Sequence, residues 1–183
     1  MRNQILTLFI FTSFTSFSQK DSVRKIQLTV YLESYYSYDF SRPINHEKPD
    51  FNYNYKKHNQ LNINLAFLKA GYQTKRLRSN LALMTGNYTM YNLSAEPNWA
   101  KPLLEANIGY KPFEKHNFWI DAGVMPSHIG FESAVGSDCW NLTRSILAEN
   151  SPYYESGIKF NYTNEKQDLY IAFHVLNGWQ KIA

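Results

Sequence analysis

Residues 26–40 alternate between two kinds of side chain, and this alternation constrains the fold more than any other feature of the chain. The even-numbered positions are apolar or aromatic apart from Ser34, whereas the odd-numbered positions carry the charged and amide side chains, Glu33 and Asp39 among them. Successive side chains of a β-strand point to opposite faces, so the segment predicts a strand with one apolar and one polar face. It is longer than the usual five or six residues of a soluble strand. This pattern suits a transmembrane β-barrel, in which one face meets lipid and the other a polar lumen.

The first eighteen residues have the parts of a secretory signal peptide. Arg2 supplies a positive charge, residues 5–17 form an apolar segment, and residues 16–18 (Ser-Phe-Ser) form a small-x-small cleavage site. We therefore predict a signal peptide over residues 1–18 and an exported mature chain from Gln19; the alternative is a buried N-terminal strand or helix. The apolar segment is too short to span a membrane, and no later stretch approaches about 20 apolar residues.

The composition fits an exported protein that relies on a core or a membrane for its stability. A single cysteine, Cys139, excludes a disulfide bond within the chain. Aromatic residues make up 16% of the chain, as expected where aromatic girdles meet two bilayer interfaces. The mean hydropathy of −0.47 does not oppose a barrel, because half of each barrel strand faces water. The net charge of +4 is scattered, which argues against the dense basic face of a nucleic-acid-binding protein.

Seven segments show strand alternation and predict an all-β fold, an antiparallel up-and-down transmembrane β-barrel within residues 19–183. The expected strands cover residues 26–40, 59–73, 76–92, 103–112, 117–125, 153–163 and 167–177. In the second strand the residues expected to share the apolar face are Leu61, Ile63, Leu65 and Phe67. Short connections alternate with long ones at residues 41–58, 92–102 and 126–152, as periplasmic turns alternate with outer loops in outer-membrane barrels.

Seven strands do not complete a bacterial barrel. Single-chain bacterial barrels use even numbers of strands, and an open sheet edge in lipid leaves backbone groups unpaired. Residues 179–183 also resemble a loop rather than a final strand that ends in an aromatic residue. We therefore expect an incomplete barrel of about seven strands, an N-terminal fragment or truncated product of a larger one.

The long connection and its flanks hold the most distinctive stretches of sequence. These are residues 123–133, 141–157 and 177–180, with Tyr31–Tyr36 near the start. Together they resemble the OmpL-like beta-barrel porins of Gram-negative bacteria, over nearly all of the mature chain. The resemblance implies an outer-membrane channel for small solutes, of which this chain is roughly the N-terminal half, and it brings no catalytic residues.

Residues 126–152 are the candidate pore-constriction loop, because a long loop of a porin can fold into the lumen and narrow it. The charged residues of this segment are His128, Glu132, Asp138, Arg144 and Glu149. Charges of both signs across a pore create a transverse field that selects polar solutes. In the alternative interpretation the loop packs over the barrel mouth, and Arg144 forms a structural ion pair with Glu149 or Glu155.

The polar faces of the strands supply the candidate lumen wall. Its residues are Glu33, Asp39, Asn62, Asn64, Arg78, Asn80, Glu105, Asn107, Asp121, Glu155 and Lys159. In a lipid-spanning barrel they must face water, because an arginine or lysine on the lipid side costs about 2–4 kcal/mol at the midplane. In a soluble sheet the same residues would form a solvated outer face.

We predict no cofactor, no metal site and no catalytic site. The histidines, His46, His58, His116, His128 and His174, are far apart and lack metal-binding spacing. Zinc requires three or four converging ligands. No Gly-x-Ser-x-Gly motif occurs, and nothing fixes the separation of the glutamates that paired-carboxylate chemistry would require.

The leading hypothesis is a non-enzymatic porin of the outer membrane, or its N-terminal part, that lets small hydrophilic solutes diffuse passively. Its partners would be the lipid bilayer and the solutes; a homo-oligomer is left open, and nucleic acid is excluded. The alternative is a secreted or outer-membrane all-β protein that binds glycans or proteins through aromatic residues, and a barrel enzyme is a third class. Strands of about nine or more residues with a continuous apolar belt would favour the porin. A second sheet over the apolar face would favour the binding protein.

Overall fold

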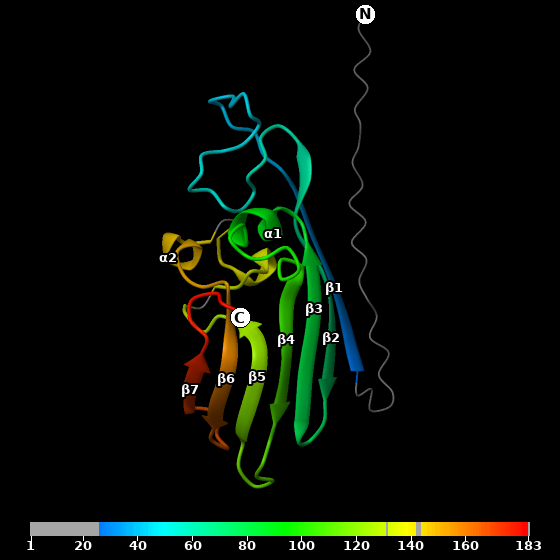
Figure 1. Cartoon of the computed structure of the whole chain (residues 1–183), viewed down its shortest axis with the longest axis vertical. Helices are drawn as coiled ribbons and strands as arrows, with labels where there is room; N and C mark the ends of the chain where they lie inside the picture. The colour runs from blue at the N-terminus through cyan, green and yellow to red at the C-terminus, as the bar shows by residue number, and fades with distance from the viewer. Residues whose placement is uncertain (1–25, 131, 142–143, 183) are drawn as a thin grey trace, which may run out of the picture.

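The computed structural model describes residues 26–130, 132–141 and 144–182, so the signal peptide predicted at residues 1–18 lies outside the described residues. The described chain forms one antiparallel sheet whose strands follow the order of the sequence (Figure 1). The strands are β1 (Ile26–Tyr36), β2 (Leu61–Gln73), β3 (Leu77–Thr85), β4 (Leu103–Tyr110), β5 (Phe118–Pro126), β6 (Tyr154–Thr163) and β7 (Tyr170–Leu176). Two short helices, α1 (Asn87–Asn92) and α2 (Ile146–Glu149), lie in the connections. No helix among the described residues is long and apolar enough to cross a membrane.

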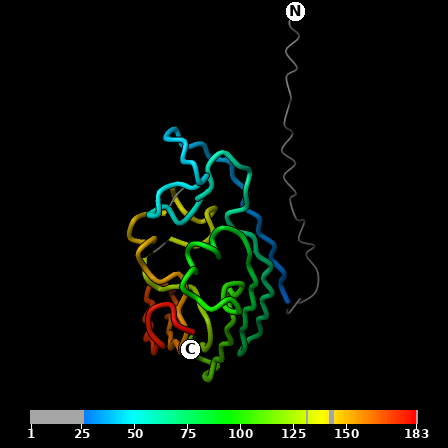
Figure 2. The backbone as a smooth tube through the Cα atoms, turned by 45° about the horizontal axis from the view of Figure 1, so that its top comes forward, coloured from blue at the N-terminus to red at the C-terminus, as the bar shows by residue number. Residues whose placement is uncertain are grey.

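The sheet is an unclosed meander. Within the described residues β1 pairs with β2 alone and β7 with β6 alone, so the two outer strands lie at opposite edges, as Figures 1 and 2 both show. The all-β, antiparallel, up-and-down fold expected from the sequence is thereby confirmed, and its unclosed form is that of a partial β-barrel.

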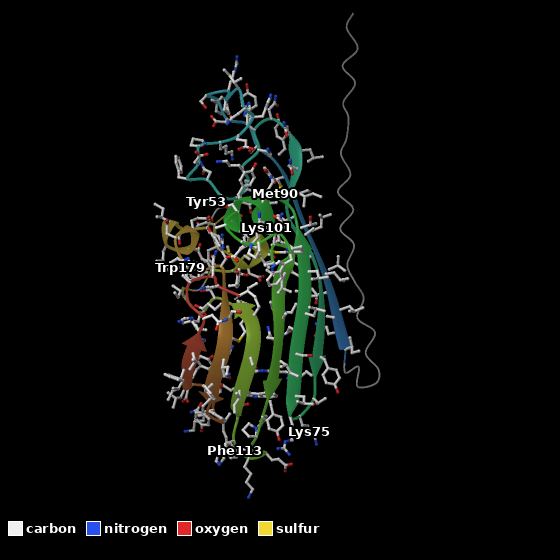
Figure 3. All side chains as sticks on the ribbon, viewed as in Figure 1. Tyr53, Lys75, Met90, Lys101, Phe113 and Trp179 are labelled. Atoms are coloured by element: carbon white, nitrogen blue, oxygen red, sulfur yellow. The ribbon has the colours of Figure 1, made fainter. Side chains whose placement is uncertain are left out.

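The connections sort by length between the two ends of the sheet. Residues 37–60, 86–102 and 127–153 form the loop end, and the short segments 74–76, 111–117 and 164–169 form the turn end. In Figure 3, Tyr53 and Met90 mark the loop end, while Lys75 and Phe113 mark the turn end. The tight turns follow from local side-chain bonds. In one of them Asn164 Oδ1 accepts hydrogen bonds from the backbone N–H groups of residues 168 and 169, both at 3.1 Å.

The register places like residues in rows across the strands. One row consists of Arg78, Gly109, Asp121, Lys159 and His174. Another consists of Ser79, Ile108, Ala122, Ile158 and Val175. Side chains directly opposite one another on paired strands share a face, and successive rows belong to opposite faces. The sheet therefore has a polar face, which bears the first row, and an apolar face, which bears the second.

Burial on the two faces is the reverse of that in a soluble sheet. Leu28 and Val30 on the apolar face are 68% and 76% exposed, whereas Asp121 on the polar face is only 4% exposed. In a water-soluble domain large apolar side chains cluster inside and charged ones remain outside. This arrangement matches the wall of a β-barrel with an apolar outer face and a polar inner face.

The expected face pattern of the second strand is wrong beyond Asn64, because a β-bulge lies there. The register between β1 and β2 shifts between Glu33 and Ser34, which leaves Asn64 without a paired residue. An extra residue reverses the facing of everything beyond it, because strand side chains alternate with period two. Leu65 is therefore fully buried, and Phe67 lines a cavity on the polar face, instead of sharing the exposed face of Leu61.

Two of the expected strands extend well past their observed C-terminal ends. The first ends at Tyr36 rather than at residue 40, and the third ends at Thr85 rather than at residue 92. Gly86 follows the third strand with φ 119°, and a Cβ atom there would lie 2.6 Å from the carbonyl oxygen of Asn64. The chain can turn this close to β2 only because position 86 has no side chain, and it then enters α1.

The apolar core lies at the loop end on the polar side of the sheet. Its buried members are Leu65, Met84, Tyr88, Leu93, Val124 and Tyr154. Tyr88 belongs to α1 and is 1% exposed, so this helix anchors the connection to the ends of the strands. The core is therefore confined to the space beneath the loops and does not extend along the whole sheet.

Candidate functional site

The polar face carries a charge network centred on Asp121 of β5. Arg78 of β3 binds it through two nitrogens, with Nε–Oδ1 at 2.6 Å and Nη2–Oδ2 at 2.5 Å. Asn161 donates to Asp121 Oδ2 at 2.7 Å, and Lys159 Nζ lies 3.9 Å from the same oxygen. The Arg78 guanidinium also lies over the Trp119 ring, 4.3 Å from its centroid. A carboxylate buried in this way is stable because cations and donors surround it.

Two further rows of the polar face, nearer the loop end, also carry paired side chains. Lys69 Nζ of β2 contacts both carboxylate oxygens of Glu105 on β4, at 2.8 and 3.0 Å. Asn80 Nδ2 donates to Asn107 Oδ1 at 3.1 Å, and Asn107 Nδ2 donates to the carbonyl of Val124 at 3.0 Å. These bonds connect β2 to β5 across the polar face.

Glu33 of β1 anchors the loops to the wall. It accepts hydrogen bonds from the Tyr55 hydroxyl at 2.7 Å and from Asn64 Nδ2 at 2.8 Å. Burial raises the pKa of Tyr55, and the hydrogen bond to Glu33 raises it further. A Cβ atom added to Gly136 would collide with Glu33 Oε1, so the segment around Gly136 packs directly against this carboxylate. The loops of residues 37–60 and 127–153 therefore meet at one residue of the wall.

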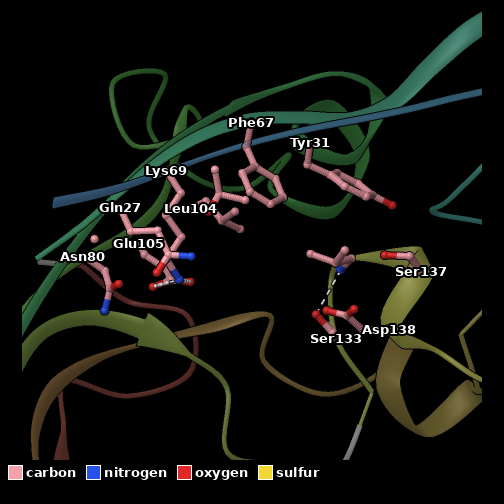
Figure 4. Close-up of a pocket in the computed structure, with 13 residues that line it drawn as sticks. Gln27, Tyr31, Phe67, Lys69, Asn80, Leu104, Glu105, Ser133, Ser137 and Asp138 are labelled. Atoms are coloured by element: carbon pink, nitrogen blue, oxygen red, sulfur yellow. Dashed lines mark hydrogen bonds and ion pairs between the residues drawn. The ribbon is translucent and has the colours of Figure 1, made fainter. Parts of the chain in front are cut away.

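Between this segment and the sheet lies a cavity of about 550 Å³. Its walls are residues 27, 29, 31, 67, 69, 71, 80, 104 and 105 of the sheet and residues 133, 135, 137 and 138 of the loop. Figure 4 shows Ser133, Ser137 and Asp138 across the cavity from Tyr31, Phe67 and Lys69. The long loop thus lies over the polar face, and the space between them is lined by both polar and aromatic side chains.

The buried side chain of Arg144 stabilises the loop through an ion pair and contacts with aromatic rings. Its side chain is 8% exposed, its Nε lies 3.2 Å from Glu149 Oε1, and its guanidinium lies over the ring of Tyr153 at 4.7 Å. It also lies over Tyr88, whose pKa is raised to about 12 by burial, against the opposing effect of the Arg144 charge. This is the geometry of the structural ion pair with Glu149 that the sequence left open as an alternative.

The other charged residues of the loop differ in their roles. Glu132 accepts the backbone N–H of Ser145 at 3.1 Å, and Ser145 Oγ caps α2 by accepting from the N–H of Ala148 at 3.3 Å. His128 Nδ1 lies 2.6 Å from Glu155 Oε2. Of the five residues predicted for a constriction, Asp138 is the one that lines the 550 Å³ cavity.

The candidate wall residues are placed unequally. Nine of them take part in the contacts given above: Glu33, Asn64, Arg78, Asn80, Glu105, Asn107, Asp121, Glu155 and Lys159. Asn62 lies at the loop end of β2, where its Oδ1 accepts from the N–H of Ile63. Asp39 lies beyond the end of β1 and accepts from Ser41, so it belongs to the connection and not to a strand.

The sequence reasoning missed two residues of the charge networks, Lys69 and Trp119, and placed a third, Asn161, on the polar face of its strand. Lys69, Trp119 and Asn161 all contact residues of the candidate wall. Alternation identifies Asn161 because it follows Lys159 by two positions. Lys69 follows the bulge at Asn64, which obscures the facing of β2 in the sequence.

Two pairs of histidines that are far apart in the sequence lie close together in the structure. The rings of His128 and His174 stack with centroids 4.4 Å apart, and those of His46 and His58 with centroids 6.0 Å apart. The first pair joins the segment after β5 to β7, a contact that depends on the antiparallel pairing of β5, β6 and β7 and that no spacing in the sequence reveals.

An antiparallel meander with an exposed apolar face and a charged, partly covered face is typical of the wall of a β-barrel protein. The family model described as putative beta-barrel porin-2, OmpL-like, matches residues 25–183. The chain belongs to this family of beta-barrel porins, as its resemblance in sequence implied. Comparisons with curated proteins and with solved structures give no match.

Proposed function

We propose that this chain forms part of the wall of an outer-membrane porin through which small hydrophilic solutes diffuse passively. The observation that carries the proposal is the inverted sheet, in which charged residues gather on the face that the long loop covers and large apolar residues remain exposed on the other. A polar lumen and a lipid-facing surface need this division.

The proposed selectivity is weak and based on size and polarity. Most charges on the polar face are paired, Arg78 with Asp121 and Lys69 with Glu105, so the wall presents dipoles and local fields with little net charge. The loop segment 133–138 narrows the space in front of β1 to β4 and adds the carboxylate of Asp138. Charged side chains at a narrow point set the electrostatic barrier for solutes.

The alternative, a binding protein that uses exposed aromatic residues, receives less support. It would require a second sheet or another layer over the apolar face, and the described residues place no strand there. The strands run from 7 to 13 residues, and five of the seven reach nine or more, close to the length that a tilted strand needs to cross a bilayer.

The localisation and partners follow from the same proposal. A chain exported by residues 1–18 would insert its apolar face into the outer-membrane bilayer, with the solutes on the polar side. Exposed aromatic residues near the turn end, such as Tyr110, Phe113 and Tyr170, would lie at the level of the lipid headgroups. No catalytic step is assigned to the protein.

Conductance across a planar bilayer tests the function directly. The protein is reconstituted, and ion selectivity is compared between the unaltered protein, Asp138→Lys and the control Glu114→Lys at the turn end. We expect conducting events and a shift towards anion selectivity in Asp138→Lys only. Silent bilayers from protein shown to be folded and inserted would contradict a porin, and an equal shift in both variants would remove Asp138 from the path.

A further inference from the structure

His128, Glu155 and His174 bring three possible metal ligands together from three separate segments of the chain. His128 follows β5, Glu155 lies in β6 and His174 lies in β7. One ligand atom from each residue lies within 4.8 Å of the other two. Nothing in the porin function proposed above requires this grouping.

Two members of the group bury a polar atom, and one of these atoms has no hydrogen-bond partner within the described residues. Glu155 is 3% exposed, and its Oε2 contacts His128 Nδ1 at 2.6 Å. Nδ1 of His174 is buried and has no hydrogen-bond partner within the described part of the chain. A buried carboxylate needs a positive partner and a buried ring nitrogen needs a bond, because desolvating either one alone is costly. A single cation between them would satisfy both.

The geometry is close to that of a zinc site with its ion removed. Metal–ligand bonds of about 2.0–2.2 Å in a tetrahedral site put donor atoms about 3.3–3.5 Å apart. The 2.6 Å contact between His128 and Glu155 would lengthen by under an ångström, and the remaining separations, at most 4.8 Å, would shorten by a little more. The stacked imidazoles, 27° from parallel, would turn so that their nitrogens converge. The His128 side chain is 48% exposed, which leaves it free to turn and leaves the site open to water.

The nearby charges decide which ion the site can take. Lys159 lies opposite His174 in the register and disfavours a cation, but its ammonium group is directed towards Asp121 at 3.9 Å. Two imidazoles and one carboxylate suit zinc, copper and nickel better than calcium or magnesium, which prefer oxygen ligands throughout.

We propose that His128, Glu155 and His174 bind one divalent transition-metal ion of the zinc type, with water completing its coordination. The ion would fasten the start of the long loop, at His128, to β6 and to the outer strand β7. The site lies on the polar side of the sheet at its loop end, and its role is to fix the loop and the last described strand.

Metal binding is measured on the whole chain folded in detergent micelles, so the result does not depend on conductance. After equilibration with Zn²⁺ and removal of free ion, bound zinc is counted by mass spectrometry, and affinity is obtained by competition with a chelator. We expect one ion per chain, and binding at least about tenfold weaker in His128→Gln and in His174→Gln. His116→Gln, at the turn end, and His58→Gln, in the other histidine pair, serve as controls that keep the affinity. Equal affinity in all four variants, or a loss confined to His58→Gln, would overturn the proposal.

A second measurement, with Cu²⁺ bound to the unaltered chain, tests the site even if a variant fails to fold. The electron paramagnetic resonance spectrum of Cu²⁺ bound to the unaltered chain reports the number of coordinated imidazole nitrogens. We expect the signature of two nitrogens in the unaltered chain, and of one in either His→Gln variant that folds. A spectrum from the unaltered chain with no imidazole nitrogen, or with only one, would refute the site.

Discussion

On the apolar face of the sheet, side chains such as Leu28 and Val30 stay largely uncovered, whereas on the polar face Asp121 is enclosed by partners from several strands. The first face depends on its surroundings, since an exposed apolar surface is stable only in hydrocarbon or against another protein. The second depends on the chain itself, because each buried charge requires its own partner. The comparison teaches that one sheet can depend on its surroundings on one side and on specific pairs within the chain on the other.

The largest expected effect comes from placing a charge on the apolar face. Leu81 lies at the middle of β3 and is 52% exposed, and its neighbour Asn80 lies on the polar face. We expect Leu81→Arg to destabilise the protein in lipid vesicles by about 2–4 kcal/mol, because the guanidinium must leave water. Asn80→Arg should cost clearly less, since water reaches that face. Urea unfolding in vesicles compares the two, and equal losses would mean that the apolar face does not meet lipid.

The next effect tests whether pairing stabilises the polar face. Arg78→Met leaves the Asp121 carboxylate with Asn161 and the distant Lys159, so we expect a loss of up to about 3 kcal/mol in the free energy of unfolding. Arg76→Met removes an exposed arginine whose Nη1 lies 3.8 Å from Glu114, and should cost under about 1 kcal/mol. If the two variants unfold at the same urea concentration, the Asp121 network contributes no more than a surface ion pair.

These two faces also differ in how well the sequence predicts them. The apolar face follows from local alternation, and all seven strands lie where the alternation indicates, with corrected ends at Tyr36 and Thr85. The prediction of which face each β2 side chain occupies is wrong after Asn64. The bulge there depends on the pairing of β1 with β2, and the sequence of one strand does not reveal it. The switch into α1 was missed because Gly86 reads as part of a strand until the neighbouring backbone of β2 is in place.

The partners on the polar face are beyond the reach of periodicity. Alternation identifies Arg78 and Asp121 as polar-face residues, but their pairing depends on the register of β3, β4 and β5. The contact between His128 and His174 likewise requires three strands to pair in order. For Arg144 the sequence offered both a pore role and an ion pair with Glu149, and the choice depends on the packing of Tyr88 and Tyr153 around it.

A smaller change in stability is expected from a substitution at the end of β3, where the chain turns into α1. Gly86 has φ 119°, and its missing side chain leaves room for the backbone of β2. We expect Gly86→Ala to destabilise the protein by about 2 kcal/mol, from backbone strain together with the clash. The control Gly130→Ala also has positive φ, 78°, but no atom lies within 4 Å of the added carbon, so about 1 kcal/mol is expected there. Thermal unfolding in detergent measures both, and a larger loss at Gly130 would show that the close approach to β2 is unimportant.

The smallest expected change in stability comes from an ion pair at the loop end, away from the strands. Hydrogen bonds from Lys57 at 2.7 Å and from Tyr91 at 2.6 Å hold the pKa of Glu47 below its ordinary value of 4.5. Because this pKa is lowered in the folded state, its contribution to stability is present above pH 4.5 and is lost as the pH falls through the folded value. Glu47 lies near the surface, so we expect Glu47→Gln to cost under about 1 kcal/mol at neutral pH.

The pH dependence gives this last variant its diagnostic value. The difference in unfolding free energy between the unaltered chain and Glu47→Gln should shrink steadily below pH 4.5, because protonation of Glu47 removes the same ion pair. A difference that persists unchanged in acid would assign the effect to packing around Tyr91. Glu114→Gln at the turn end provides the matched control, since that glutamate is exposed and its contact with Arg76 is long, at 3.8 Å. A difference that shrinks in acid would instead assign the effect to the ion pair between Glu47 and Lys57 at the loop end.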